Sequence, residues 1–268
     1  MGDPIRRRVL VTGASRGIGR ATAGLLAARG YEVFGTSRNP AGIPQGDLIP
    51  GIVYLPFDLE KPGSAEDLAA RTGPIDVLIN NAGMSQIGTV EEITAPSVYR
   101  IFEQNFFGQL RLIKLYLPGM RDRRSGTIIN IGSLAGRTPV PFSSMYAATK
   151  AAIEALSKGL RSEVSGFGIH VVTVAPCPIN TTLQQEKTYS DSSPYLNLVK
   201  QVKDPRDRNL REGPSPVEVA ERIGRILESP NPRPYYPAGR SASFIALRVK
   251  CFPERLVERI VRKRFGIG

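Results

Sequence analysis

The chain of 268 residues contains no tryptophan, a single histidine and only two cysteines. Cys177 and Cys251 lie far apart and without CxxC spacing, which excludes a disulfide framework and a structural zinc site. We therefore expect two reduced thiols and no bound metal. The single histidine, His170, begins an expected strand and is interpreted as structural. Aromatic residues make up only 7% of the chain, but the 41% apolar content suits a globular core and excludes a largely disordered protein.

Long apolar runs are missing as well. No stretch approaches the roughly 20 apolar residues that a membrane-spanning helix requires, and residues 1–8 lack the apolar core of a secretory signal. These features lead us to expect a cytoplasmic protein. A length of 268 residues suits one large α/β domain, assigned to residues 1–240, followed by a tail over residues 241–268.

Negative charge is scarce, with 24 Asp and Glu against 36 Lys and Arg and a net charge of +12. Such a balance is typical of proteins that bind nucleic acid, an anionic membrane surface or an acidic cofactor. The excess is concentrated near the end: residues 233–268 hold nine basic and two acidic residues, which leaves only +5 on the other 232 residues. No nucleic-acid recognition motif accompanies the charge, so we expect no nucleic-acid partner.

Buried strands and helices alternate along the chain. Runs such as Val77-Leu-Ile79 lack alternation of polar and apolar residues, as expected for parallel strands that helices cover on both faces. The pattern predicts a Rossmann-type doubly wound parallel sheet of about seven strands. Between residues 184 and 216 the chain is polar without a clear strand, and this segment is either a mobile lid or a surface excursion. Strands are expected at residues 8–12, 31–36, 52–57, 76–79, 126–131 and 169–175, and helices near 20–29, 64–71, 97–117 and 144–164.

A glycine-rich turn follows the first strand. Gly13, Gly17 and Gly19 stand between this strand and the first helix, where they let backbone N–H groups approach a phosphate at the positive end of the helix. The spacing is GxxxGxG rather than GxGxxG, and glycines also close ordinary turns of this kind. The turn therefore indicates a nucleotide cofactor only together with other features.

The end of the second strand bears on the choice of cofactor. A site for NAD usually has an Asp or Glu here for the ribose hydroxyls, whereas this strand ends in Ser37 and Arg38. Arg38 and Arg16 can reach a 2′-phosphate, and Ser37 can donate a hydrogen bond to it. The sequence favours NADP(H) over NAD(H), the alternative being that Arg38 is an ordinary solvated arginine.

Three residues form a candidate reactive group. Tyr146 and Lys150 are four apart in a helical pattern and so share one helix face. Tyrosine has a pKa near 10 in water, and a nearby ammonium can stabilise its phenolate. Ser133 follows the preceding strand, at the sheet edge where ligands of such folds bind, and can orient a carbonyl.

With these features the sequence resembles the short-chain dehydrogenases/reductases that carry the TGxxxGxG motif, and it is similar to the hydroxysteroid and retinol dehydrogenases and acyl-ketone reductases among them. The resemblance covers about residues 8 to 182. Its motifs, in the family's order, are Thr12-Gly-Ala-Ser-Arg-Gly-Ile-Gly19, Asn80-Asn-Ala-Gly83, Asn105, Ser133, Tyr146-Ala-Ala-Thr-Lys150, and Pro176 followed by Thr181.

The resemblance implies roles for these residues. It makes Tyr146 the general acid or base, Lys150 the group that holds the nicotinamide ribose and lowers the pKa of Tyr146, and Ser133 the group that positions the carbonyl. Asn105 would hold a water that links Lys150 to solvent. A homo-oligomer, dimer or tetramer, is also implied. The residues expected to contact NADP(H) are Gly13, Ser15, Arg16, Gly17, Ile18, Gly19, Ser37, Arg38, Asp58, Leu59, Asn81, Ala82, Gly83, Tyr146, Lys150, Pro176, Ile179 and Thr181.

One position departs from the family pattern. Cys177 stands where the family usually has glycine, and its side chain is expected to narrow the nicotinamide pocket or alter the backbone before Ile179 and Thr181, unless it simply packs as a small residue. The residues expected to border the active site are apolar and suggest a lipophilic substrate. They are Pro139-Val-Pro-Phe142, Met145 and Leu183.

The tail is expected to hold two helices, near residues 242–251 and 254–265. In the second, apolar residues from Leu256 to Phe265 share one face and basic residues occupy the others, so the helix either lies in a membrane interface or packs on the domain or a partner subunit. The sequence thus predicts an NADP(H)-dependent oxidoreductase that interconverts a lipophilic ketone and a secondary alcohol. The alternative is a non-catalytic NADP(H)-sensing regulator.

Overall fold

The computed structural model describes residues 6–181, 183–239, 242, 244, 246 and 251–267. Its centre is a parallel sheet in the order β3-β2-β1-β4-β6-β7-β9. The strand order reverses between β1 and β4, as the doubly wound expectation requires. The strands are β1 (Arg8–Val11), β2 (Glu32–Ser37), β3 (Ile52–Pro56), β4 (Val77–Asn80), β6 (Gly126–Ile131), β7 (Ile169–Pro176) and β9 (Tyr235–Ala238).

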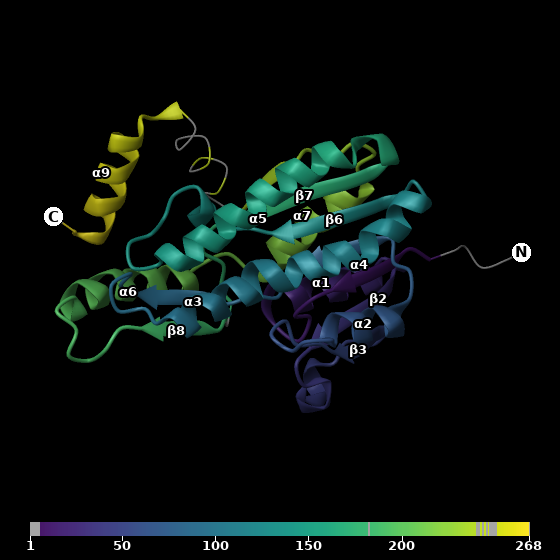
Figure 1. Ribbon diagram of the computed structural model, residues 1–268, viewed down its shortest axis with the longest axis horizontal. Helices are drawn as coiled ribbons and strands as arrows, with labels where there is room; N and C mark the ends of the chain where they lie inside the picture. Colours follow the sequence, from purple (N-terminus) through teal and green to yellow (C-terminus); the bar gives the residue numbers. More distant parts are fainter. Residues whose placement is uncertain are drawn as a thin grey trace, which may run out of the picture.

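Helices cover both faces of this sheet (Figure 1). Side chains alternate across a strand, so in β1 Val9 and Val11 join the core on one face while Leu10 joins the core on the other. The first core includes residues of α1 and α7, and the second includes residues of α2, α4 and α5. Both faces are therefore buried, which explains why the strands read as continuous apolar runs. The helices are α1 (Gly17–Ala28), α2 (Ser64–Thr72), α3 (Ala95–Phe102), α4 (Gly108–Asp122), α5 (Ser144–Glu163), α6 (Leu196–Arg211), α7 (Pro216–Glu228) and α9 (Glu254–Phe265).

The single helix expected near residues 97–117 is interrupted. α3 passes into a π-helical turn, Glu103–Phe107, before α4 begins. At this turn the side chain of Asn105 is held by Met84 and Thr149, so its position is fixed by groups outside the helix. The tertiary contact explains why a helical sequence pattern does not give one regular helix.

The polar segment between residues 184 and 216 is more regular than expected. Strand β8 (Gln185–Thr188) pairs in parallel with β5 (Ser85–Gly88) to form a separate two-stranded sheet. The following helix, α6, buries Val199 and Val202 although it contains Pro205. The prediction of no clear strand here was wrong, because β5 and β8 are short and polar and lack the usual signature of strands.

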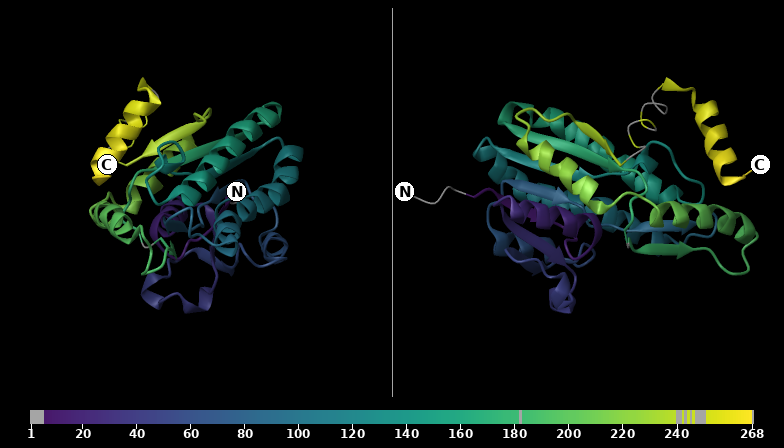
Figure 2. Two further views of the ribbon diagram at one scale, coloured as in Figure 1. Left: turned by 60° about the vertical axis from the view of Figure 1, so that its left-hand side comes forward. Right: turned by 180° about the vertical axis from the view of Figure 1, so that it is seen from behind.

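The second expected tail helix is confirmed as α9, whereas most of the first, near 242–251, lies outside the described residues. Figure 2 shows α9 beside α6 at one end of the molecule. Gln201 Nε2 of α6 donates a hydrogen bond of 2.6 Å to the carbonyl of Gly266, and Phe265 is buried. Within the described residues no helix is both long and apolar enough to cross a membrane.

Candidate active site

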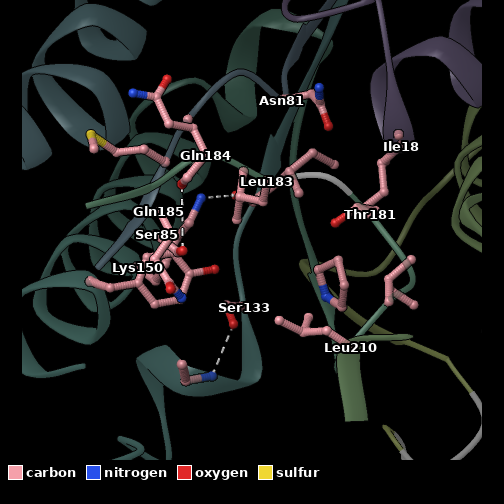
Figure 3. Close-up of a pocket in the computed structure, with 18 of the residues that line it drawn as sticks. Ile18, Asn81, Ser85, Ser133, Lys150, Thr181, Leu183, Gln184, Gln185 and Leu210 are labelled. Carbon is pink, nitrogen blue, oxygen red and sulfur yellow. Dashed lines mark hydrogen bonds between the residues drawn. The ribbon is translucent and has the colours of Figure 1, made fainter. Parts of the chain in front are cut away.

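A cavity of about 700 Å³ opens at the carboxyl edge of the sheet. Figure 3 shows Lys150 and Ser133 across it from Ile18 and Thr181. Gly19 and Asn105 are not among the residues that line it, whereas the other sequence-predicted site residues are. These lining residues are Gly13, Ser15, Arg16, Gly17, Ile18, Ser37, Arg38, Asp58, Leu59, Asn81, Ala82, Gly83, Ser133, Tyr146, Lys150, Pro176, Ile179 and Thr181.

The glycine-rich turn is compact for steric reasons. Gly13 and Gly17 adopt positive φ angles of 68° and 56°, which favour glycine. A Cβ at Gly19 would collide with the carbonyl of Gly13 and the side-chain amide of Asn81. The same amide donates to the carbonyl of Thr12 at 2.8 Å, so the TGxxxGxG and NNAG segments hold each other in place.

The start of α1 suits a phosphate. No side chain caps the helix, and its first turn contains no acidic residue, so its N–H groups are available to an anion. Arg16 and Arg38 line the same part of the cavity, and neither makes an ion pair within the described residues. Arg38 Nη2 instead donates a hydrogen bond of 3.1 Å to Gln184 Oε1. The start of α1 and the two arginines together suit the binding of a phosphorylated cofactor.

Tyr146 and Lys150 project from one face of α5, with the lysine Nζ 5.9 Å from the centroid of the tyrosine ring. Lys150 is buried and donates a hydrogen bond of 2.8 Å to the carbonyl of Ile131. Burial lowers the pKa of Lys150 from 10.5 to about 8. The lysine is thus held between a strand end and the phenol, and it titrates close to neutral pH.

The phenol of Tyr146 stays protonated at neutral pH. Burial raises its pKa above the usual value, and a hydrogen bond with Ser133 and then the charge of Arg206 oppose this rise. The Ser133 hydroxyl oxygen also accepts a hydrogen bond of 3.1 Å from the Ala135 N–H. Ser133 and Tyr146 therefore present two hydroxyl groups side by side, and the phenol holds a proton that it can donate.

Asn105 joins the loop after β4 to α5. Its Oδ1 accepts a hydrogen bond of 2.9 Å from the Met84 N–H, and its Nδ2 donates to the Met84 carbonyl at 2.9 Å and to Thr149 Oγ1 at 3.0 Å. Thr149 directly precedes Lys150 in α5. The side chain of Asn105 therefore positions the helix turn that carries the lysine.

The arrangement agrees with the comparison to known proteins, in which residues 7–191 match the family model described as short chain dehydrogenase. The chain belongs to the short-chain dehydrogenases. It is 35% identical over 235 residues to a 3-ketodihydrosphingosine reductase of Bacteroides thetaiotaomicron, with 84% of each chain covered. It is also 31% identical over 249 residues to retinol dehydrogenase 8 of Homo sapiens, with 84% of this chain and 79% of that protein covered.

Solved structures agree with this family. A short-chain dehydrogenase from Streptomyces avermitilis has a TM-score of 0.81 and 32% identity over 97% of this chain and 98% of its own. A short-chain dehydrogenase from Burkholderia cenocepacia, solved in complex with NADP, has a TM-score of 0.75 and 25% identity over 95% of this chain and 97% of its own. The family is one of oxidoreductases that act on CH–OH and C=O groups with NAD(P).

In this short-chain dehydrogenase Cys177 packs beside the sheet. It contacts the small apolar cluster that includes Leu134 and Tyr235, and a Cβ at Gly239 would collide with its Sγ. Its backbone N–H donates a hydrogen bond of 2.9 Å to the carbonyl of Ala238 in β9. Cys177 therefore packs as a small residue and also lines the cavity together with Ile179.

The substrate end of the dehydrogenase was only partly predicted. Of the expected apolar border, Val140 and Leu183 line the cavity, whereas Pro139, Phe142 and Met145 are not part of its wall. Sequence reasoning missed the contribution of α6 to the cavity, and it left open whether the last helix packs on the domain, as α9 does, or lies in a membrane interface. The amphipathic pattern of residues 254–265 was the available signal, but it did not show which surface the apolar face of the helix contacts. The missed residues of these helices are Arg206, Asp207, Asn209, Leu210, Val261, Arg264 and Phe265.

Proposed function

We propose that this chain is an NADP(H)-dependent oxidoreductase that reduces a lipophilic ketone to a secondary alcohol. The observation that carries the proposal is the meeting, in one cavity, of the Ser133–Tyr146 hydroxyl pair with the uncapped start of α1. Apolar side chains at the far end of this cavity, including Leu210, Val261 and Phe265, support a lipophilic substrate.

The mechanism follows from the positions of the side chains. NADPH supplies the hydride when bound. Arg38, Ser37 and the N–H groups of α1 would hold its phosphates, and Lys150 would hold its nicotinamide ribose. Ser133 donates a hydrogen bond that orients the substrate carbonyl, and Tyr146 gives its phenolic proton to the carbonyl oxygen as general acid. The ammonium of Lys150 then stabilises the phenolate that remains.

A direct test is NADPH oxidation by the purified protein with retinoid, long-chain acyl, steroid and small ketones. We expect turnover with the lipophilic members of this panel. Tight NADPH binding without turnover of any ketone would instead favour the NADP(H)-sensing regulator. That alternative gains no support from the site itself, because the tyrosine, lysine and serine are all in place.

Arg38→Leu is expected to change the choice of cofactor. Loss of a charge-assisted hydrogen bond to the 2′-phosphate should lower kcat/KM for NADPH by about 10- to 100-fold, while that for NADH stays nearly constant. Steady-state kinetics with both cofactors measure the effect. Arg71→Leu, at an exposed arginine of α2, serves as the control. Equal losses with NADPH and NADH would contradict the role of Arg38.

We further propose that α9 brings this protein, expected in the cytoplasm, into contact with anionic membranes. Val257, Val261 and Phe265 turn toward the protein, whereas Leu256 and Ile260 remain 42% and 44% exposed. The exposed pair is flanked by basic residues. These are Arg255, Arg259, Arg262 and Lys263. An apolar strip bordered by cations is typical of a helix at a lipid interface.

The double variant Leu256→Ser/Ile260→Ser is expected to lower partitioning onto phosphatidylserine vesicles by about tenfold or more, because two apolar side chains no longer enter the bilayer. Vesicle co-sedimentation measures the change, and the residues that pack on the domain are left intact. Leu48→Ser/Val217→Ser removes two other exposed apolar side chains, 41% and 54% exposed, as a matched control. Equal sedimentation of all three proteins would remove the membrane proposal.

The proposal also includes a homo-oligomer. Tyr99, Phe107 and Leu115 lie exposed along α3, the π-helical turn and α4, where a second copy can cover them. Sedimentation equilibrium tests this, and a monomer at micromolar concentration would refute it.

A further inference from the structure

Arg206 brings a positive charge into the substrate end of the cavity. It belongs to α6 and lines the same cavity as Tyr146. Its Nη1 donates hydrogen bonds to two neutral groups, the hydroxyl of Ser143 at 2.8 Å and the carbonyl of Gln86 at 3.1 Å. These bonds fix the guanidinium on the cavity wall without neutralising its charge.

No carboxylate of the described residues forms an ion pair with this arginine. Among the ion pairs of the described residues, Asp207 is paired with Lys203, and none includes Arg206. The other acidic residue of the cavity wall, Asp58, belongs to the loop after β3, next to Leu59. Burial lowers the pKa of Arg206, and Tyr146 and Asp207 oppose this effect. The substrate end therefore holds a partly desolvated cation, with Asp207 nearby but in no direct ion pair with it among the described residues.

The guanidinium lies close to the reacting groups. Ser143, which it binds, is the residue before α5 and precedes Tyr146 by three positions, and the charge of Arg206 acts on the phenol of Tyr146. An oxygen atom that meets Arg206 should therefore sit within a few bonds of the carbonyl that meets Tyr146.

We propose that Arg206 is a specificity-determining residue that binds a second, electron-rich oxygen of the substrate, placed one or two carbons from the ketone. The inference rests on the proposed ketone reduction and names its substrate class: a 3-oxo acid, ester or thioester with an apolar chain. The apolar side chains Leu210, Val261 and Phe265 receive the chain. The charge of Arg206 repels an ammonium group at the same place, so amino ketones are excluded.

The test compares three substrates of equal chain length: methyl 3-oxodecanoate, a simple medium-chain ketone and the corresponding amino ketone. Wild-type protein should reduce the 3-oxo ester with a kcat/KM about 10- to 100-fold above that of the simple ketone, since a hydrogen bond to a charged donor discriminates to this extent. Arg206→Met should bring the ratio close to one. The ratio of the two kcat/KM values reports substrate recognition alone, because any influence of Arg206 on Tyr146 affects both substrates alike.

Two further variants keep this test interpretable. Arg206→Lys retains a cation and should preserve part of the preference, which a purely structural arginine would not explain. Arg208→Met removes an exposed arginine from the same helix and should leave the ratio unchanged. An unchanged ratio in Arg206→Met, or a wild-type preference for the amino ketone, would overturn the proposal while leaving ketone reduction intact.

A binding measurement separates this inference from the proposed function. Calorimetric titration of the NADP-loaded protein with 3-hydroxydecanoate should show binding that Arg206→Met weakens by about tenfold or more. If wild-type protein reduced no ketone, the proposed function would fail, yet this titration would still decide whether Arg206 binds the oxygen. Equal affinity of both proteins would refute the role of Arg206.

Discussion

Tyr146→Phe is expected to lower kcat for ketone reduction by a factor of about 10²–10⁴, the range for loss of a positioned general acid. Burial keeps the pKa of this phenol above its usual value, so at neutral pH it carries the proton that the product alkoxide needs. Phenylalanine has the same ring and fills the same space without that proton. Single-turnover NADPH oxidation measures the chemical step directly.

Cofactor binding should survive this substitution. NADPH affinity, measured by fluorescence titration, is expected to change by less than about threefold, because the proposal assigns most cofactor contacts to the α1 turn, the arginines and Lys150. Full turnover by Tyr146→Phe would show that another group, with Ser133 the nearest, donates the proton. A joint loss of binding and turnover would point to a collapsed site instead.

Lys150→Met is expected to inactivate the protein and at the same time to stabilise it. The pKa shift of Lys150 from 10.5 to about 8 corresponds to about 3 kcal/mol of unfolding free energy that its buried charge removes at neutral pH. Loss of the hydrogen bond to Ile131 costs about 1 kcal/mol, which leaves a net gain of about 2 kcal/mol. Activity should fall about 100-fold or more, because the ammonium group that would stabilise the phenolate and hold the nicotinamide ribose is lost.

The gain in stability of Lys150→Met over wild type should become smaller as the pH rises. Between about pH 8 and 10.5 the folded wild-type protein has released the lysine proton while the unfolded chain retains it, so wild-type stability rises with pH relative to the variant. Urea unfolding at pH 7 and pH 9.5 should therefore show a difference that shrinks at the higher pH. Lys114→Met, at an exposed lysine of α4, should show no such trend. A variant that is less stable than wild type at pH 7 would disprove this account of Lys150.

Residues in short motifs were predictable from sequence because their roles are local. Tyr146 and Lys150 meet through helix periodicity, and the glycines of the first turn meet the start of α1 through chain continuity. Neither pairing depends on the rest of the fold. The parallel sheet was predictable for a similar reason, since strands buried on both faces are apolar throughout.

Features that depend on distant contacts were not predictable. The π-helical turn at Asn105 arises from bonds to Met84 and Thr149, which a helical pattern cannot reveal. β5 and β8 pair across about 100 positions with polar sequences, so neither has the composition of a strand. Arg206 looked like one of several charged residues around a proline, and only the folded α6 brings it to Ser143.

Because α9 packs back against the cavity, the size of the accepted substrate and the proton transfer depend on residues that are far apart in the chain. Val261 and Phe265 line the cavity, while Tyr146, the proposed proton donor, stands in α5, more than 100 positions earlier. Changes in the last helix can thus alter the molecular size that the protein accepts without disturbing the proton transfer. A family with this layout can diversify its substrates through changes in its last helix while the chemical step stays the same.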